Sequence, residues 1–475
     1  MSTETRGRDR RARRRAAARR FALTLATVLG ALAVLGGAGA AVSLAQGPRL
    51  SGVQADPSSA TEVSGSRVIL TANQALAGID PSQVTVSPSA PFTVDASGRS
   101  VGVRFTVPLD DDTEYTVTVA GAQAVGGGPV TDLQTTFRTP AAEVFVLQRD
   151  PDGDDTIFRT ALHGREAVPV YTHPSIDDFR ATSTRLVVAT VDDGVSSLHV
   201  MDRAGGGESE VRLPGDGIVQ GLQVSQRGDL AGFTYSDPQG DGYASVLFTA
   251  ELADPSADPR PIEVGGETVS VDRWRFVPDA SSLLLIDFEG RLVLTDPESD
   301  ADPTMLGTAL TIDAINRGDY TATVERISEG TETDIVQLDL TTGEETALVE
   351  PDEDFGLLGA VSPVPPERGG TVRVYQRMLD ESRPESQLLV HVADDGSSRT
   401  LFQVGSEDAM LQACVSPSGR YVAALVAPDI ISNAYDVGTQ PLPGRLETHI
   451  VDLDTAETVS VLSGFDISWC TTGPW

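Results

Sequence analysis

The chain contains no lysine, because all 35 of its basic residues are arginine. Without a lysine amine, the protein cannot form a Schiff base, attach pyridoxal phosphate or build a Walker-type phosphate loop. Histidine is also scarce, with five residues, and cysteine occurs only at Cys414 and Cys470, which is too few for a thiolate metal site. These absences exclude several classes of enzyme, and we expect neither a cofactor nor a bound metal.

Charge is unevenly distributed along the chain. Residues 1–20 hold nine arginines and two acidic residues, although the formal net charge of the whole chain is −34. The rest of the protein is therefore strongly acidic, which helps to keep an exposed protein soluble. Such a surface repels phosphate backbones, so we expect no nucleic-acid partner.

The segment 21–45 is uncharged and mostly apolar. As a helix it would extend about 37 Å, which is enough to cross the hydrocarbon core of a bilayer. The basic tail 1–20 should stay in the cytoplasm, which predicts a single-pass plasma-membrane protein with its C-terminal body outside. The alternative is a signal peptide cleaved near Ala45, which would give a secreted protein, although 21–45 is longer than the apolar region of most signal peptides.

Residues 47–140 carry the pattern of a β-sandwich. Short β-branched segments such as Ser66–Thr71, Val101–Val107 and Tyr115–Val119 are often alternating and are separated by Pro, Gly, Asp and Asn. No helical period competes with this pattern.

Three pieces of the same region carry a family resemblance. They are Ala55–Pro57 near its start, Leu109–Val119 (LDDDTEYTVTV) and Thr136–Pro140 at its end. Together they resemble a bacterial Ig-like domain of the SbsA surface-layer type. The resemblance implies a spacer or adhesive module without catalytic residues.

Residues 141–475 contain a repeat, in which a strand ending near an Asp, a tight turn and a second strand recur every 43 to 58 residues. Copies are LHVMDRAGGGESEVRL (198–213), IVQLDLTTGEETALV (335–349) and THIVDLDTAETVSVL (448–462). This period is the length of a four-stranded propeller blade. The segment ACVSPSGRYVAALV (413–426) resembles the repeat of TolB-like and WD-type β-propellers, and the order of the parts resembles membrane-anchored actinobacterial-type surface proteins.

The two ends of the repeat region indicate how a propeller would close. Residues 143–149, 156–162 and 167–171 form three strands without an inner partner, whereas 464–470 is a single strand left over. If the C-terminal strand completes the first blade, both free edges are paired and seven blades close into a ring. Six or eight blades are the alternatives. The predicted fold class is thus all-β, with an N-terminal transmembrane helix, an Ig-like sandwich and a seven-bladed propeller.

Cys414 and Cys470 fall on inner strands of neighbouring blades, next to this closure. A disulfide is permitted outside the cytoplasm, and we predict a Cys414–Cys470 bridge. Two buried, unlinked thiols are the alternative.

Two sets of polar residues are candidates for a site. His199, His391 and His449 occupy equivalent repeat positions, so they should lie in different blades, too far apart to share one metal ion. Four aspartates in inner-strand regions are predicted to line an acidic channel on the propeller axis, and the alternative is that they hydrogen-bond neighbouring strands. These aspartates are Asp178, Asp272, Asp313 and Asp466.

These features together predict a non-catalytic surface protein. Its propeller would present loops to an unknown protein or cell-envelope component, while the Ig-like domain lifts the propeller off the membrane. A small-ligand or metal-binding sensor is one alternative. A hydrolase acting through paired carboxylates on the propeller face is another, and the scarcity of histidine and the lack of a convincing nucleophile disfavour it.

Overall fold

The computed structural model describes Arg19 and residues 21–37, 46–225, 229–238, 242–327, 333–380, 383–436 and 438–474. Residues 21–37 are helical. Over the residues described, no helix is both long enough and apolar enough to cross a bilayer. The end of the predicted span, 38–45, and the predicted tail 1–20 apart from Arg19 lie outside the described residues.

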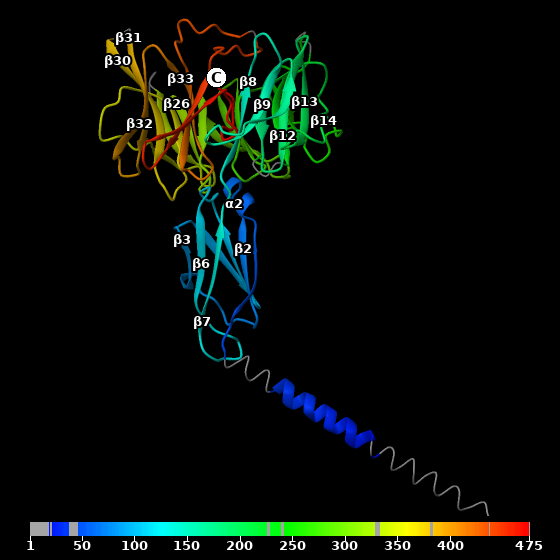
Figure 1. Cartoon of the computed structure of the whole chain (residues 1–475). Helices are drawn as coiled ribbons and strands as arrows, with labels where there is room; N and C mark the ends of the chain where they lie inside the picture. The colour runs from blue at the N-terminus through cyan, green and yellow to red at the C-terminus, as the bar shows by residue number, and fades with distance from the viewer. Residues whose placement is uncertain are drawn as a thin grey trace, which may run out of the picture.

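The first folded body is a sandwich of two antiparallel sheets, drawn in blue and cyan in Figure 1. One sheet has the order β1-β2-β5-β4 and the other the order β3-β6-β7. The strands are β1 (Leu50–Ala55), β2 (Arg67–Ala72), β3 (Val84–Ser87), β4 (Phe92–Ser97), β5 (Ser100–Phe105), β6 (Glu114–Ala122) and β7 (Thr131–Arg138). Two short helices, α2 (Pro57–Glu62) and η1 (Pro81–Gln83), lie between strands.

The core of the sandwich follows from the alternation seen in the sequence. Val101, Val103 and Phe105 of β5 are buried in one cluster with Tyr115 and Val117 of β6, whereas the residues between them are less buried. Successive side chains of a strand point to opposite faces, so alternate positions from both sheets fill the space between the sheets. Strands β1 to β7, between Leu50 and Arg138, therefore form a β-sandwich.

The second body contains, within the described residues, one three-stranded sheet, six four-stranded sheets and a two-stranded hairpin, all antiparallel. The three-stranded sheet is β8 (Glu143–Gln148), β9 (Asp155–Ala161) and β10 (Val168–His173). The four-stranded sheets are β11 (Ile176–Ala181), β12 (Arg185–Asp192), β13 (Val195–Asp202), β14 (Ser209–Val211); β15 (Ile218–Val224), β16 (Leu230–Ser236), β17 (Val246–Glu251), β18 (Arg260–Pro261); β21 (Val271–Phe276), β22 (Leu283–Asp287), β23 (Arg291–Thr295), β24 (Thr304–Thr308); β25 (Thr311–Ile315), β26 (Thr321–Ile327), β27 (Thr333–Asp339), β28 (Glu345–Ala347); β29 (Leu357–Pro363), β30 (Thr371–Asp380), β31 (Arg383–Val392), β32 (Ser398–Gly405); and β33 (Ala409–Val415), β34 (Tyr421–Ala427), β35 (Glu447–Asp452), β36 (Thr458–Ser463). The hairpin is β19 (Glu263–Val264) and β20 (Glu267–Thr268).

The sheets are packed one against the next around an axis. The first strand of each four-stranded sheet lies beside the first strand of the next one, from β11 through β15, β21, β25 and β29 to β33. Apolar clusters fill the space between neighbouring sheets: Val187 and Val200 of one sheet, for example, pack with Phe233 and Phe248 of the next. Sheets that stack face to face with their first strands innermost form a β-propeller.

The C-terminal segment closes this arrangement, as predicted. Phe465 and Leu147 of β8 exchange two backbone hydrogen bonds of 2.9 Å each, and the Ser468 N–H donates to the Phe145 carbonyl at 3.1 Å. The segment pairs through one isolated bridge, whereas a regular strand was expected. Gly464 and Asp466 on either side of the bridge have positive φ angles, 117° and 55°, which end the extended backbone.

The sandwich packs against one face of the propeller through arginine–carboxylate contacts. Arg368 binds Asp110 at 2.9 Å, Arg420 binds Asp111 at 3.3 Å, and Arg203 binds Glu62, the last residue of α2, at 2.8 Å. We call this side of the propeller the covered face. We call the opposite side the free face. It is made by the loops between the second and third strands and by the connections between sheets. In Figure 1 it is the side on which β30 and β31 meet, away from the sandwich.

Candidate functional site

A cavity of about 720 Å³ lies on the propeller axis. Its wall is built by the first strands of five consecutive sheets, β15, β21, β25, β29 and β33, and by residues 469–473 of the C-terminal segment. A volume of this size falls in the range of small-ligand sites in proteins. The cavity is therefore the candidate functional site.

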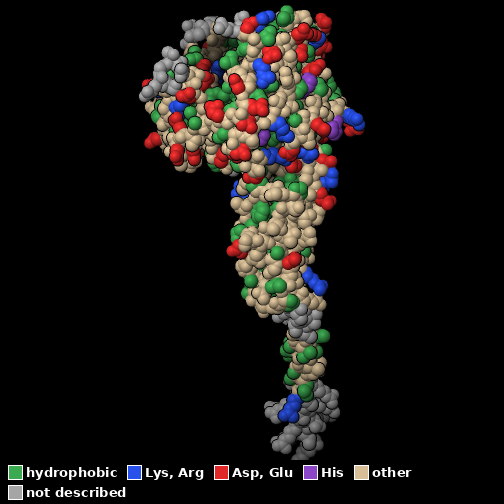
Figure 2. Space-filling model, turned by 90° about the vertical axis from the view of Figure 1, so that its left-hand side faces the viewer, with side chains coloured by type: hydrophobic (Ala, Val, Ile, Leu, Met, Phe, Trp, Pro, Cys, Tyr) green, Lys and Arg blue, Asp and Glu red, His purple; other side chains and the backbone are tan. Residues whose placement is uncertain are grey.

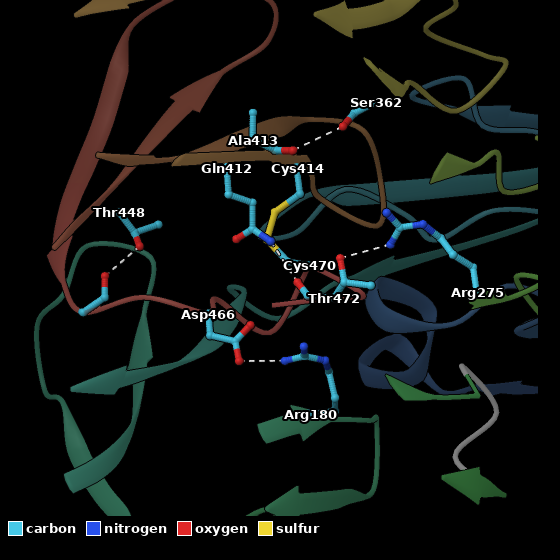
Figure 3. The surroundings of a disulfide bond; sticks show 11 residues. Arg180, Arg275, Ser362, Gln412, Ala413, Cys414, Thr448, Asp466, Cys470 and Thr472 are labelled. Carbon is cyan, nitrogen blue, oxygen red and sulfur yellow. Dashed lines mark hydrogen bonds and ion pairs between the residues drawn. A yellow bond between two sulfur atoms is a disulfide. The ribbon is translucent and has the colours of Figure 1, made fainter. Parts of the chain in front are cut away.

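The C-terminal segment, which forms part of the wall of this cavity, is fixed by the contacts drawn in Figure 3. The predicted disulfide between Cys414 of β33 and Cys470 is present, with 5.6 Å between the two Cα atoms. Beyond it, the Gln412 side chain donates to the Thr472 carbonyl at 2.8 Å and the Arg275 Nη1 donates to the Thr472 hydroxyl at 3.0 Å. The segment is thus held by one covalent bond and by polar contacts from two different sheets.

Two of the four predicted aspartates line the cavity, and two do not. Asp272 and Asp313 belong to its wall. Asp178 and Asp466 are buried away from it and bind the same guanidinium, that of Arg180, at 2.7 and 2.6 Å (Figure 3 shows the Asp466 contact). Because Asp466 comes from the C-terminal segment and Arg180 from β11, this buried ion pair helps to close the ring.

The wall of the cavity is not acidic, which corrects the prediction of an acidic channel. Its charged residues are three arginines against two aspartates, Arg273, Arg275, Arg317, Asp272 and Asp313. The outer surface differs, since acidic side chains are spread over the propeller in Figure 2. The alternation along β21 is the signal that sequence reasoning missed, because Trp274 and Phe276 are buried while the two arginines occupy the intervening positions.

Arg275 and Arg317 are the two of these cations that form no ion pair among the described residues. Burial lowers the pKa of Arg275 to about 10; Asp313 opposes this change, and the positive charges of Arg180 and Arg273 add to it. Burial likewise raises the pKa of Asp313, against the effects of the Thr311 hydroxyl, Arg275 and a backbone N–H. The cavity therefore places a cation and a carboxyl group together in an environment that favours neither charge.

A second cavity of about 670 Å³ lies between the propeller and the sandwich. Residues of α2, including Glu62, form part of its wall, and Arg317, Ser416 and Cys470 line both cavities. Arg317 Nη1 donates to the Glu62 carbonyl at 3.3 Å. On the covered face, α2 of the sandwich therefore lies at the end of the propeller axis.

The three repeat histidines lie on third strands of three different sheets, as predicted. His199 is in β13 beside Glu208 at 3.0 Å, and His449 is in β35 beside Glu447 at 3.3 Å. His391 in β31 contacts the Gly369 carbonyl at 3.0 Å. Among the residues that the structure describes, no group of three or more His, Cys, Asp or Glu side chains is placed to hold a metal ion.

Large apolar side chains are exposed on the loops of the free face. Ile431 is 94% exposed, in the long β34–β35 loop that rises above the propeller in Figure 1, and Phe288, at 63%, also lines the rim of the central cavity. The others on this face are Tyr243, Leu310, Ile327, Leu357, Leu358, Leu379 and Tyr435. These side chains come from loops of different sheets, so exposed apolar groups are distributed around the free face.

No protein-family model matches the chain, and no curated protein matches its sequence. Solved structures to which it is similar include TolB from Acinetobacter baumannii, with a TM-score of 0.37 and 13% identity over 68% of this chain and 80% of that one. The β-propeller domain of Cps50 from Myceliophteria thermophila gives 0.39 and 12% over 67% and 89%. An oligogalacturonate lyase in complex with manganese gives 0.46 and 11% over 76% and 96%.

These structural neighbours are TolB-like and WD-type propellers and an enzyme. Because every TM-score is below 0.5, the assignment of a propeller to this chain rests on its own sheets. The SbsA-type identity of the sandwich stays a prediction from the sequence.

Proposed function

We propose that this chain is a non-catalytic, extracytoplasmic binding protein whose free face docks a protein partner. The observation that carries the proposal is the asymmetry between the two faces of the propeller. The sandwich occupies the covered face through three arginine–carboxylate contacts, whereas the free face exposes large apolar side chains such as Phe288, Leu357 and Ile431. Apolar and aromatic side chains of this kind form the centres of protein interfaces.

The proposed architecture has seven blades. Each four-stranded sheet is one blade, and the three-stranded sheet β8–β10 becomes the seventh when residues 465–468 pair with β8. The sandwich is then an Ig-like spacer. The helix over 21–37 belongs to an anchor that includes residues 38–45, with the basic tail on the cytoplasmic side.

Site-specific photo-crosslinking on intact cells tests the docking surface. A photoreactive residue placed at Ile431, on the free face, should capture one identifiable partner. The matched control is Val461, which is 48% exposed on the outermost strand β36 and does not belong to the loops of the free face. The double variant Phe288→Ser/Ile431→Ser, crosslinked from Tyr435, should lose the capture. Capture of the same proteins from positions 431 and 461 would contradict the proposal.

Protease accessibility tests the proposed topology. Trypsin cleaves after arginine, and the body beyond residue 46 contains many arginines. Trypsin added to intact cells should remove the body while leaving a cell-associated fragment that contains the tail 1–20. A body that becomes cleavable only after the cells are lysed would contradict an extracytoplasmic location.

A further inference from the structure

The Arg275 side chain in the wall of the central cavity is acted on by the positive charges of Arg180 and Arg273, and unlike those two it forms no ion pair among the described residues. Arg180 binds Asp178 and Asp466, and Arg273 lies 3.5 Å from Asp272. Over the described residues, no carboxylate oxygen lies within 4.0 Å of the Arg275 guanidinium, although Asp313 acts on it from a greater distance. Arg275 is thus a partly buried cation that lacks a close counter-charge.

The Arg275 guanidinium is held in a fixed orientation. Its Nε donates to the Ile312 carbonyl at 2.9 Å and its Nη1 to the Thr472 hydroxyl at 3.0 Å. A guanidinium has five N–H donors, and these are the two that are used among the described residues. The remaining donors belong to the planar Nη end, which matches the paired oxygens of a carboxylate or phosphate.

We infer that the central cavity contains a binding site for a small ligand that carries a carboxylate or a phosphate group, with the Arg275 guanidinium as its charged anchor. This site lies on the axis, and Phe288 at its rim is shared with the apolar docking surface on the loops of the free face. Phe288 at the rim and Trp274 in the wall would contact the apolar part of such a ligand.

Three properties of the cavity support an oxyanion as the missing partner. A desolvated cation is costly unless it is paired, and the Arg275 guanidinium in the cavity wall has no carboxylate oxygen within 4.0 Å among the described residues. The volume of about 720 Å³ accommodates a small molecule. The rest of the protein is strongly acidic, with a net charge of −34 for the chain, so a generally anion-binding surface is not expected and the site should be local.

Ligand-induced thermal stabilisation and calorimetry of the full chain in detergent test this site with three probes at matched ionic strength: succinate, inorganic phosphate and chloride. Succinate or phosphate at about 10 mM should raise Tm by about 2 °C for a Kd of about 1 mM. Saturable binding of succinate alone identifies a carboxylate ligand, and binding of phosphate identifies a phosphate ligand. A rise in Tm that chloride produces equally would overturn the inference.

Variants at two neighbouring arginines decide whether Arg275 is the anchor. Arg275→Gln should weaken the Kd by about 10- to 100-fold, because a charge-assisted hydrogen-bond pair is lost. Arg273→Gln is the matched control, since Arg273 lines the same cavity but pairs with Asp272, and it should leave Kd within about twofold. Arg275→Lys keeps the charge without the planar fork and should also bind more weakly; it carries the test if Arg275→Gln does not fold. Unchanged affinity in the Arg275 variants would refute the site.

Discussion

Removal of the disulfide should destabilise the propeller more than any other single change at its closure. The bridge joins Cys414 to Cys470 across a sequence separation of 56 residues. In the chain-entropy description, a loop of that length is worth about 4 kcal/mol of unfolding free energy at 25 °C. The double variant Cys414→Ala/Cys470→Ala should lose this amount, because its unfolded chain regains the freedom that the bridge removes.

Urea unfolding followed by tryptophan fluorescence measures this loss. All three tryptophans, at positions 274, 469 and 475, belong to the propeller region, so the signal reports on the propeller and not on the sandwich. With an m-value of about 3 kcal/mol/M, a loss of about 4 kcal/mol lowers the urea midpoint by about 1 M. The change should appear in the midpoint of the propeller transition and leave any separate sandwich transition in place.

The wild-type protein provides its own control. A reducing agent should lower the midpoint of the wild type to that of the double variant, and it should have no effect on the double variant, which has no thiols. Equal midpoints for oxidised and reduced wild type would refute the reasoning. They would show that the closure of the ring holds without the covalent link.

Two further changes test contacts at the closure and at the junction. Burial raises the pKa of Asp178, and Arg180 opposes this change. The Asp178 carboxyl therefore binds its proton more tightly in the folded protein than in the unfolded chain. The stabilisation of the folded state by this protonation is present near pH 4 and is lost as the pH rises. Urea midpoints from about pH 4 to 7 should therefore vary less in Asp178→Asn than in the wild type, and equal pH profiles would contradict this. Arg368→Ala removes the Asp110 contact and should cost about 1 kcal/mol and speed tryptic cleavage at the junction, unlike Arg212→Ala, whose Asp258 partner is exposed. Equal rates of tryptic cleavage in these two variants would contradict a stabilising role of the Arg368–Asp110 contact at the junction between sandwich and propeller.

The closure of the propeller was predictable because it depends on the number of strands at each end of the repeat region. Three strands without an inner partner at one end and one strand at the other have a single economical pairing, and Leu147 and Phe465 form it. The Cys414–Cys470 disulfide was predicted from the same assignment of strands, which placed both cysteines on inner strands of neighbouring blades. The six four-stranded sheets of the second body agree with the repeat period, because a blade needs four strands of about five residues and their turns.

The sequence did not show which charged side chains face the central cavity. An aspartate in an inner strand does not show whether it faces the cavity or a neighbouring sheet, and Asp178 and Asp466 face Arg180. A signal did exist, because Arg180 follows Asp178 at a spacing of two, which places both side chains on one face of β11. The contact of Asp466 with Arg180 depends on ring closure across 286 positions, so no local pattern contains it.

The point at which the chain enters the sandwich determines which face of the propeller a binding partner can reach. β1 runs from Leu50 to Ala55 and leads directly into α2, which lies against the covered face, so the beginning of β1 is at the end of the sandwich remote from the propeller (Figure 1). An anchor that includes residues 21–37 would therefore attach at that remote end. Under the proposed function, the sandwich would separate the propeller from the membrane, and the free face, with Phe288 and the mouth of the Arg275 cavity, would point away from the bilayer. A partner would then reach both the apolar loops and the cavity from the same side.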